Sequence, residues 1–260
     1  MSETTSHDDV LRLVSIKKRY GGVRALEGVS ISFPQNTITA IVGDNGAGKS
    51  TTLKIISGAE YPDSGQVFVH GAQVKFRSPE DARQAGIETV YQDLALADNL
   101  TAAENLFMGR EEKWGRGGLA ILRQKKMQKM AEEIFKSFSI NIPSVRVPVA
   151  GLSGGQRQGV AIARAVNWGS DLVLLDEPTA ALGVAETARV EDVIHGLRKK
   201  GLTQVMVSHN LDQVFRLSDQ IAVMRRGKLV ANLKTKKTDP QSVIGLITGL
   251  ISGDEVSQRD

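Results

Sequence analysis

One eight-residue stretch constrains this chain more than any other, Gly43-Asp44-Asn45-Gly46-Ala47-Gly48-Lys49-Ser50. It fits the pattern G-x-x-x-x-G-K-S/T, in which glycines let the backbone curl until several N–H groups converge. Converging N–H groups bind phosphate oxygens, and a helix expected over residues 48–57 adds its positive end. In such a loop Lys49 reaches the β- and γ-phosphates, Ser50 ligates Mg²⁺, and Thr51 lies beside them. We therefore expect this loop to bind a nucleotide.

The sequence on either side of the loop supports this interpretation. Residues 38–42 are an apolar run typical of a buried strand. Residues 51–57 continue as a helix, and Gly58 is a plausible helix stop. A chance glycine turn would not need a strand before it and a helix after it, so the order favours a phosphate-binding loop.

Composition sets limits on the class of protein. The 260 residues are 41% apolar, enough for one large α/β domain or a core with an inserted subdomain. With 33 basic and 29 acidic residues the net charge is only +4, and the basic clusters are short and scattered, so we expect no nucleic-acid partner. There is no cysteine, which excludes disulfides, and no apolar run approaches the ~20 residues of a membrane-spanning helix.

The remaining periodicity predicts strands and helices around an irregular middle. Residues 95–168 look mainly helical, with an amphipathic basic helix over 122–138, and we interpret this region as an insertion in the core. The other expected strands are 11–16, 28–33, 66–69, 73–76, 87–91, 172–175, 204–207, 221–224 and 229–231, and the other expected helices are 79–86, 184–200 and 239–251.

Leu152-Ser153-Gly154-Gly155-Gln156 opens a further helix. Ser153 and Gln156 have the spacing of a capping box. A capping box does not explain two adjacent glycines at a helix start, where glycine costs stability relative to alanine. Close approach of the backbone to a phosphate does explain them.

Polar residues follow two of the predicted buried strands. Asp176 and Glu177 end the strand over 172–175, and His209 follows the strand over 204–207. Ligands of open parallel sheets bind at the carboxyl ends of the strands. Asp176 could hold Mg²⁺, Glu177 could orient or deprotonate an attacking water, and His209 could contact the γ-phosphate. Alternatively, Asp176 and Glu177 are a solvated acidic pair at a strand end, and His209 is a core histidine whose ring nitrogens are hydrogen-bonded.

Tyr20 precedes Gly21-Gly22 and the nucleotide core. It could stack on adenine, or it could be an ordinary tyrosine at the end of a strand. Pattern alone leaves both interpretations open.

The phosphate loop, the Leu152–Gln156 element and Asp176-Glu177, in this order, resemble the ATPase cassette of ABC transporters. The similarity covers nearly the whole chain. It implies an α/β fold with a RecA-like P-loop core (residues 1–92 and 169–260), an antiparallel β subdomain and an inserted helical subdomain (about 93–168). It also implies ATP and Mg²⁺ as ligands.

The resemblance assigns further roles. Tyr20 would be the adenine-stacking aromatic, and Gln92 the glutamine that senses Mg²⁺ and the membrane partner. Ser153, Gly155 and Gln156, with Gly154 between them, would contact ATP held by a second copy in a head-to-tail homodimer, and His209 would be the switch histidine. One departure stands out: the family usually has an aspartate that bridges the subunits where this chain has Gly183.

Other segments look like the cassettes of bacterial monosaccharide importers, among them 89–93, 100–105, 108–110, 181–184 and 208–210. This resemblance implies a membrane permease and a periplasmic or extracellular binding protein as partners, and a location on the cytoplasmic face of the inner membrane. The alternatives are an importer of another small solute and a non-transport ABC ATPase of translation or DNA repair. Non-transport ABC ATPases usually contain a second cassette, a coiled coil or zinc-binding cysteines, and this sequence shows none of these. A P-loop small-molecule kinase would leave Leu152–Gln156 unexplained.

Overall fold

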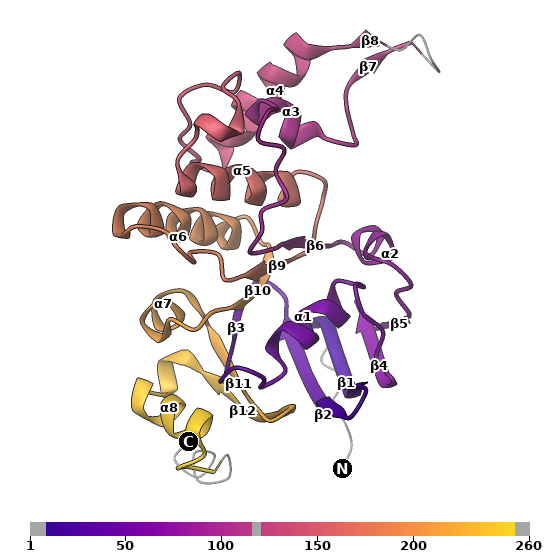
Figure 1. The fold of residues 1–260 in the computed structure, drawn as a ribbon, viewed down its shortest axis with the longest axis vertical. Helices are drawn as coiled ribbons and strands as arrows, with labels where there is room; N and C mark the ends of the chain where they lie inside the picture. The colour runs from indigo at the N-terminus through magenta and orange to yellow at the C-terminus, as the bar shows by residue number, and fades with distance from the viewer. Residues whose placement is uncertain (1–8, 116–120, 253–260) are drawn as a thin grey trace. The chain divides into compact units, whose positions relative to one another are not determined.

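The computed structural model describes residues 9–115 and 121–252 (Figure 1). These residues form two compact units. The first comprises residues up to 89, 170–177 and those from 200 onward. The second comprises residues 90–169 and 178–199. Each unit is described on its own below.

A six-stranded, mainly parallel sheet is the centre of the first unit. Strands β11, β3, β10 and β9 run parallel to one another, and β12 is antiparallel to β11. Every residue of β3 and β10 is buried, as expected for strands covered on both faces. The order across the sheet is β12 (Lys228–Lys234), β11 (Gln220–Arg225), β3 (Ile38–Val42), β10 (Thr203–Val207), β9 (Leu172–Asp176) and β6 (Ile87–Val90).

A four-stranded antiparallel sheet completes the strands of this unit, in the order β2 (Val23–Pro34), β1 (Asp9–Tyr20), β4 (Ser64–Val69), β5 (Ala72–Val74). β1 and β2 are twice as long as the predicted 11–16 and 28–33, because backbone pairing continues to Tyr20 opposite Val23. Apart from the buried Val10 and Leu26, the extra residues are exposed or half-buried, so no regular apolar alternation marks them.

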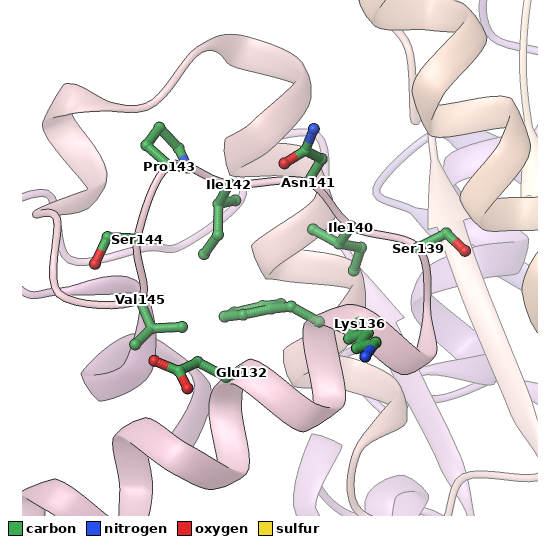
Figure 2. Close-up of a pocket in the computed structure, with 10 residues that line it drawn as sticks. Glu132, Lys136, Ser139, Ile140, Asn141, Ile142, Pro143, Ser144 and Val145 are labelled. Carbon is green, nitrogen blue, oxygen red and sulfur yellow. The ribbon is translucent and has the colours of Figure 1, made fainter.

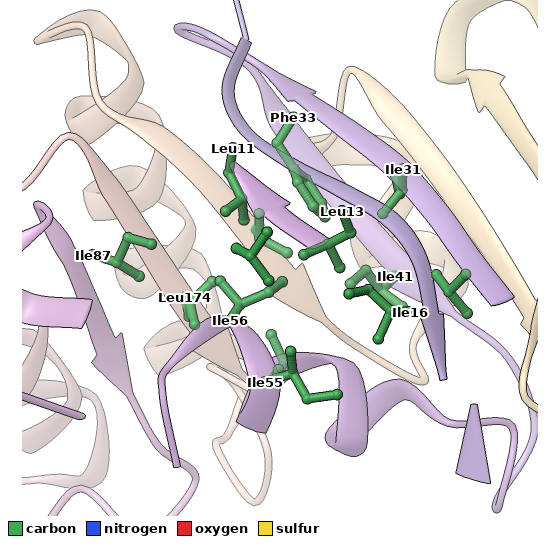
Figure 3. Close-up of a cluster of buried hydrophobic side chains, with 14 of the residues drawn as sticks. Leu11, Leu13, Ile16, Ile31, Phe33, Ile41, Ile55, Ile56, Ile87 and Leu174 are labelled. Atoms are coloured by element: carbon green, nitrogen blue, oxygen red, sulfur yellow. The ribbon is translucent and has the colours of Figure 1, made fainter. Parts of the chain in front are cut away.

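One buried apolar cluster joins the two sheets through helix α1 (Lys49–Ile56) (Figure 3). Leu11, Leu13 and Phe33 come from the antiparallel sheet, and Ile56 comes from α1. Leu174 and several neighbours come from the parallel sheet. The helix that begins at the phosphate loop is thus fixed on both sides by core packing.

Two of the remaining helices of the first unit lie close to the predicted ranges 79–86 and 239–251. They are α2 (Pro79–Gln84), which has Ser78 as N-cap and proline at its first position, and α8 (Pro240–Thr248). Helix α7 (Leu211–Leu217) and the short 3-10 turn η3 (Thr235–Lys237) were not predicted.

The second unit is mainly helical, as expected, and contains α3 (Ala102–Phe107), α4 (Gln124–Ser137), η2 (Val149–Gly151), α5 (Gly154–Val166) and α6 (Val184–Lys199). Two results differ from the sequence analysis. α6 belongs to this unit and not to the core, because it packs against α5. A short hairpin of β7 (Lys113–Trp114) and β8 (Ile121–Leu122) was not predicted, and it includes Leu122, which we expected to begin a helix. Its four paired residues are exposed, so no buried face reveals it in the sequence.

Candidate nucleotide site

The phosphate loop connects β3 to α1 in the first unit. Two positions of this loop require glycine because neighbouring backbone atoms lie too close for a side chain. A Cβ on Gly43 would lie 2.2 Å from the Met224 carbonyl oxygen. Gly48 has φ +105°, and a Cβ on it would lie 2.8 Å from the Ala25 carbonyl oxygen. Lys49 Nζ donates to the carbonyls of Gly43 at 2.8 Å and Asp44 at 3.0 Å. The ammonium group therefore lies inside the curl of the loop.

Glu177 and His209 come together at the carboxyl ends of β9 and β10. Val207 pairs with Asp176, so the residues after these strands leave the sheet side by side. Glu177 has φ +50°, and its N–H donates to Val207 O at 3.0 Å. Glu177 Oε2 lies 2.7 Å from His209 Nδ1. The Glu177 side chain is 18% exposed and that of His209 76%, so the carboxylate is sheltered while the imidazole faces solvent.

The loop and the strand ends border the same hollow. Its volume is about 510 Å³. The predicted site residues that line it are Gly43, Asp44, Asn45, Lys49, Glu177 and His209. A phosphate chain in this hollow would meet loop N–H groups, an ammonium, a carboxylate and an imidazole.

Asp176 is half-buried beside this group. Burial raises the pKa of its carboxyl, as does the neighbouring charge of Glu177, while Lys49 and Lys54 lower it. A buried carboxylate of this kind gains from a nearby cation. No group of three or more His, Cys, Asp or Glu in the described residues is arranged to hold a metal ion. The expected Mg²⁺ ligands Ser50, Gln92 and Asp176 include a single carboxylate. Such a donor set fits Mg²⁺ that is held mainly by phosphates and water.

Tyr20 lies at the end of β1 and is 41% exposed. Burial raises the pKa of its hydroxyl, as does the charge of Glu60, while Lys18 and Thr51 of α1 lower it. The Tyr20 hydroxyl therefore lies near the helix that follows the phosphate loop. Lys18 Nζ lies 5.4 Å from the centre of the Tyr20 ring. One ring face is thus already in a cation–π contact, and stacking on adenine stays a prediction.

Gln92 and the Ser153–Gln156 element lie in the second unit. Gln92 is exposed in the bend after β6. The capping box predicted at α5 is present: Gln156 N–H donates to Ser153 Oγ at 3.4 Å, and Ser153 N–H donates to Gln156 Oε1 at 3.0 Å. Gln156 Nε2 also donates to Asn141 O, which is at the edge of an open hollow of about 480 Å³ (Figure 2). This hollow contains none of the predicted site residues.

One residue of the second unit was missed by the sequence analysis. Glu186, in the first turn of α6, accepts hydrogen bonds from the N–H groups of Gly155 and Gly183, each at 3.4 Å. The Ser153 side chain and these N–H groups lower the pKa of its carboxyl. An acidic residue three positions after a helix start is a recognisable local signal. Its contact with α5, about thirty residues earlier in the chain, is not a local signal.

The sequence matches the family described as ABC transporter over residues 26–180, more than half of the chain. The chain belongs to this family. Its ABC cassette is also similar to the xylose/arabinose import ATP-binding protein XylG of Sulfolobus acidocaldarius, with 42% identity over 94% of this chain and 96% of that protein. It is 42% identical to the fructose import ATP-binding protein FrcA of Rhizobium meliloti, over 94% of this chain and 95% of that protein. A ribose import ATP-binding protein of Rubrobacter xylanophilus is 37% identical, and this chain spans 48% of its length.

Solved ABC cassettes share the fold. The structure of an ATP-binding cassette of an ABC transporter in its ADP conformation has a TM-score of 0.76 and 25% identity, over 96% of this chain and 98% of that one. The dimeric structure of a bacterial ABC transporter cassette has a TM-score of 0.72 and 26% identity, over 86% and 98%. These likenesses confirm the predicted fold class, and the chain is an ATPase of the ABC type. Among the described residues no helix is both long and apolar enough to cross a membrane.

Proposed function

We propose that this chain hydrolyses ATP to power the import of a monosaccharide. The observation that carries the proposal is that the phosphate loop, Glu177 and His209 line the same hollow. The class of solute is supported by the relatives at 42% identity, which are named for xylose/arabinose and fructose import.

The geometry supports a division of roles. The loop N–H groups and Lys49 would hold the β- and γ-phosphates, with Tyr20 beside the base. Ser50 and Asp176, with Gln92, would hold Mg²⁺, which when bound neutralises charge on the phosphate oxygens. Glu177 would orient and deprotonate the attacking water, because its carboxylate is sheltered at the ligand edge of the sheet. His209 lies 2.7 Å from that carboxylate and would hold it in position.

The working unit that we propose is a head-to-tail homodimer. In it the Ser153-Gly154-Gly155-Gln156 element of one copy contacts ATP held by the other copy, and two identical composite sites result. The likeness to a dimeric bacterial cassette supports this arrangement. A Cβ on Gly183 would meet nothing within 4 Å, so the backbone does not require glycine where the family usually has an aspartate. The bridge that this aspartate makes is absent here, and we infer that the free dimer is weak.

Transport also needs partners. We propose that a permease holds this chain at the cytoplasmic face of the inner membrane and that a periplasmic or extracellular binding protein delivers the sugar. The ATPase chain would then have no contact with the solute.

The Glu177→Gln variant tests the function. The amide keeps the shape of the side chain but removes the base, so ATP should bind normally while steady-state hydrolysis falls by about 10²–10⁴. Asp212→Asn, an exposed carboxylate of α7 that does not line the hollow, is the matched control and should hydrolyse ATP normally. In cells, Glu177→Gln should abolish uptake of one labelled monosaccharide and spare amino-acid uptake. Normal turnover would contradict the role of Glu177, and unchanged uptake of every monosaccharide tested would contradict sugar import.

A further inference from the structure

The Glu186 carboxylate occupies an anion-binding position. It accepts hydrogen bonds from Gly155 N–H and Gly183 N–H, at 3.4 Å each. The Ser153 side chain and these two N–H groups lower the pKa of the Glu186 carboxyl. Ser153 Oγ accepts a hydrogen bond from Gln156 N–H. The Glu186 carboxylate thus engages two backbone N–H groups and lies near the Ser153 side chain.

Gly155, one of the two donors, belongs with Ser153 to the element that the proposed dimer presents to ATP. In that dimer the Ser153 hydroxyl and the Gly155 N–H would meet the phosphates of the nucleotide held by the other copy. In the single chain Gly155 is buried, and a Cβ on it would lie 3.0 Å from Glu186 Cβ. The Glu186 side chain therefore covers the N–H that a phosphate would have to reach.

We propose that Glu186 is an internal stand-in for the γ-phosphate, which holds the Gly155 N–H beside Ser153 in the free chain and must leave it when two chains close on ATP. The inference rests on the proposed composite site. Two anions cannot share the same donors, because the carboxylate and the phosphate repel each other and each donor has one hydrogen. Glu186 then has two effects of opposite sign: it stabilises the free chain and it opposes closure of the dimer.

The two effects separate Glu186 from a residue that only supports the fold. Glu186→Gln keeps the side-chain length and one acceptor oxygen but removes the charge. It should lower the melting temperature of the nucleotide-free protein, because the hydrogen bonds to a charged acceptor become weaker. It should also strengthen the ATP-dependent dimer. A merely structural residue would weaken both the fold and the dimer.

The experiment measures dimer formation by light scattering in saturating Mg-ATP, on a Glu177→Gln background that does not consume the nucleotide. We expect Glu186→Gln to lower the protein concentration at half-dimerisation by about fivefold or more, the difference between a charged and a neutral hydrogen bond. Asp192→Asn removes an exposed charge from the same helix and should leave that concentration unchanged. An unchanged or raised concentration for Glu186→Gln would overturn the inference alone. If the Glu177→Gln background forms no dimer in Mg-ATP, the composite site and the inference both fail.

Discussion

The ionised Asp176 carboxylate lowers the stability of the folded chain, although we propose that it helps to bind Mg²⁺ in the site. Its pKa in the folded chain is raised, first by burial and then by Glu177. The unfolded chain releases this proton at lower pH, so stability falls as pH rises through the window between the two pKa values and the full penalty is present above that window. The buried charge therefore destabilises the protein until a cation binds beside it.

Asp176→Asn should reverse this balance. Without nucleotide at neutral pH, the variant should melt about 1–4 °C higher than the parent, because the buried charge is gone. At low pH, where the parent carboxyl is protonated, the difference should disappear. Addition of Mg-ATP should stabilise the parent more than the variant. Scanning calorimetry with and without Mg-ATP checks all three outcomes, and a lower melting temperature for the variant at neutral pH would contradict the account.

At the scale of the element, the start of α5 has a second reason for its glycines. From the sequence, close approach of a phosphate explains them. In the structure a Cβ on Gly154 would lie 2.8 Å from Leu182 Cδ2, and one on Gly155 would lie 3.0 Å from Glu186 Cβ. The two glycines thus also allow α5 to pack against the segment that begins α6.

Gly155→Ala tests this packing. Helix propensity alone would make alanine stabilising by up to about 1 kcal/mol. We expect Gly155→Ala instead to destabilise the chain, because the new methyl group lies too close to Glu186. Gly196→Ala in α6 is the matched control, since its Cβ would meet nothing within 4 Å, and it should stabilise the chain. Urea unfolding of both variants gives the comparison, and equal gains in stability would show that packing does not restrict Gly155.

What the sequence could predict follows from how local each signal is. The buried strands β3, β9 and β10 are short apolar runs, and the polar residues of the site follow them directly, so the edge of the sheet was predictable. The β7–β8 hairpin buries none of its residues and left no pattern. The contact of Glu186 with Gly155 and the grouping of α6 with α5 depend on tertiary packing between distant segments.

In the whole molecule that we propose, each complete ATP site takes residues from two chains. The first unit carries Lys49, Glu177 and His209, and the second carries Ser153 and Gly155. If each ATP site combines the first set from one copy with the second set from the other, one chain defective in the first set and one defective in the second should restore activity when they are mixed. A site made within one chain would show no complementation.

The most direct test mixes two inactive variants. Lys49→Ala removes the phosphate-loop ammonium, and Ser153→Arg blocks the element that meets the ATP of the partner, so each alone should hydrolyse almost no ATP. In a one-to-one mixture about half of the dimers are mixed and each has one complete site, so we predict recovery of up to about a quarter of the unmodified rate. Recovery should rise with protein concentration, as expected for a weak dimer. A mixture no faster than the mean of its two components at every concentration, or full activity of Ser153→Arg alone, would contradict the composite site.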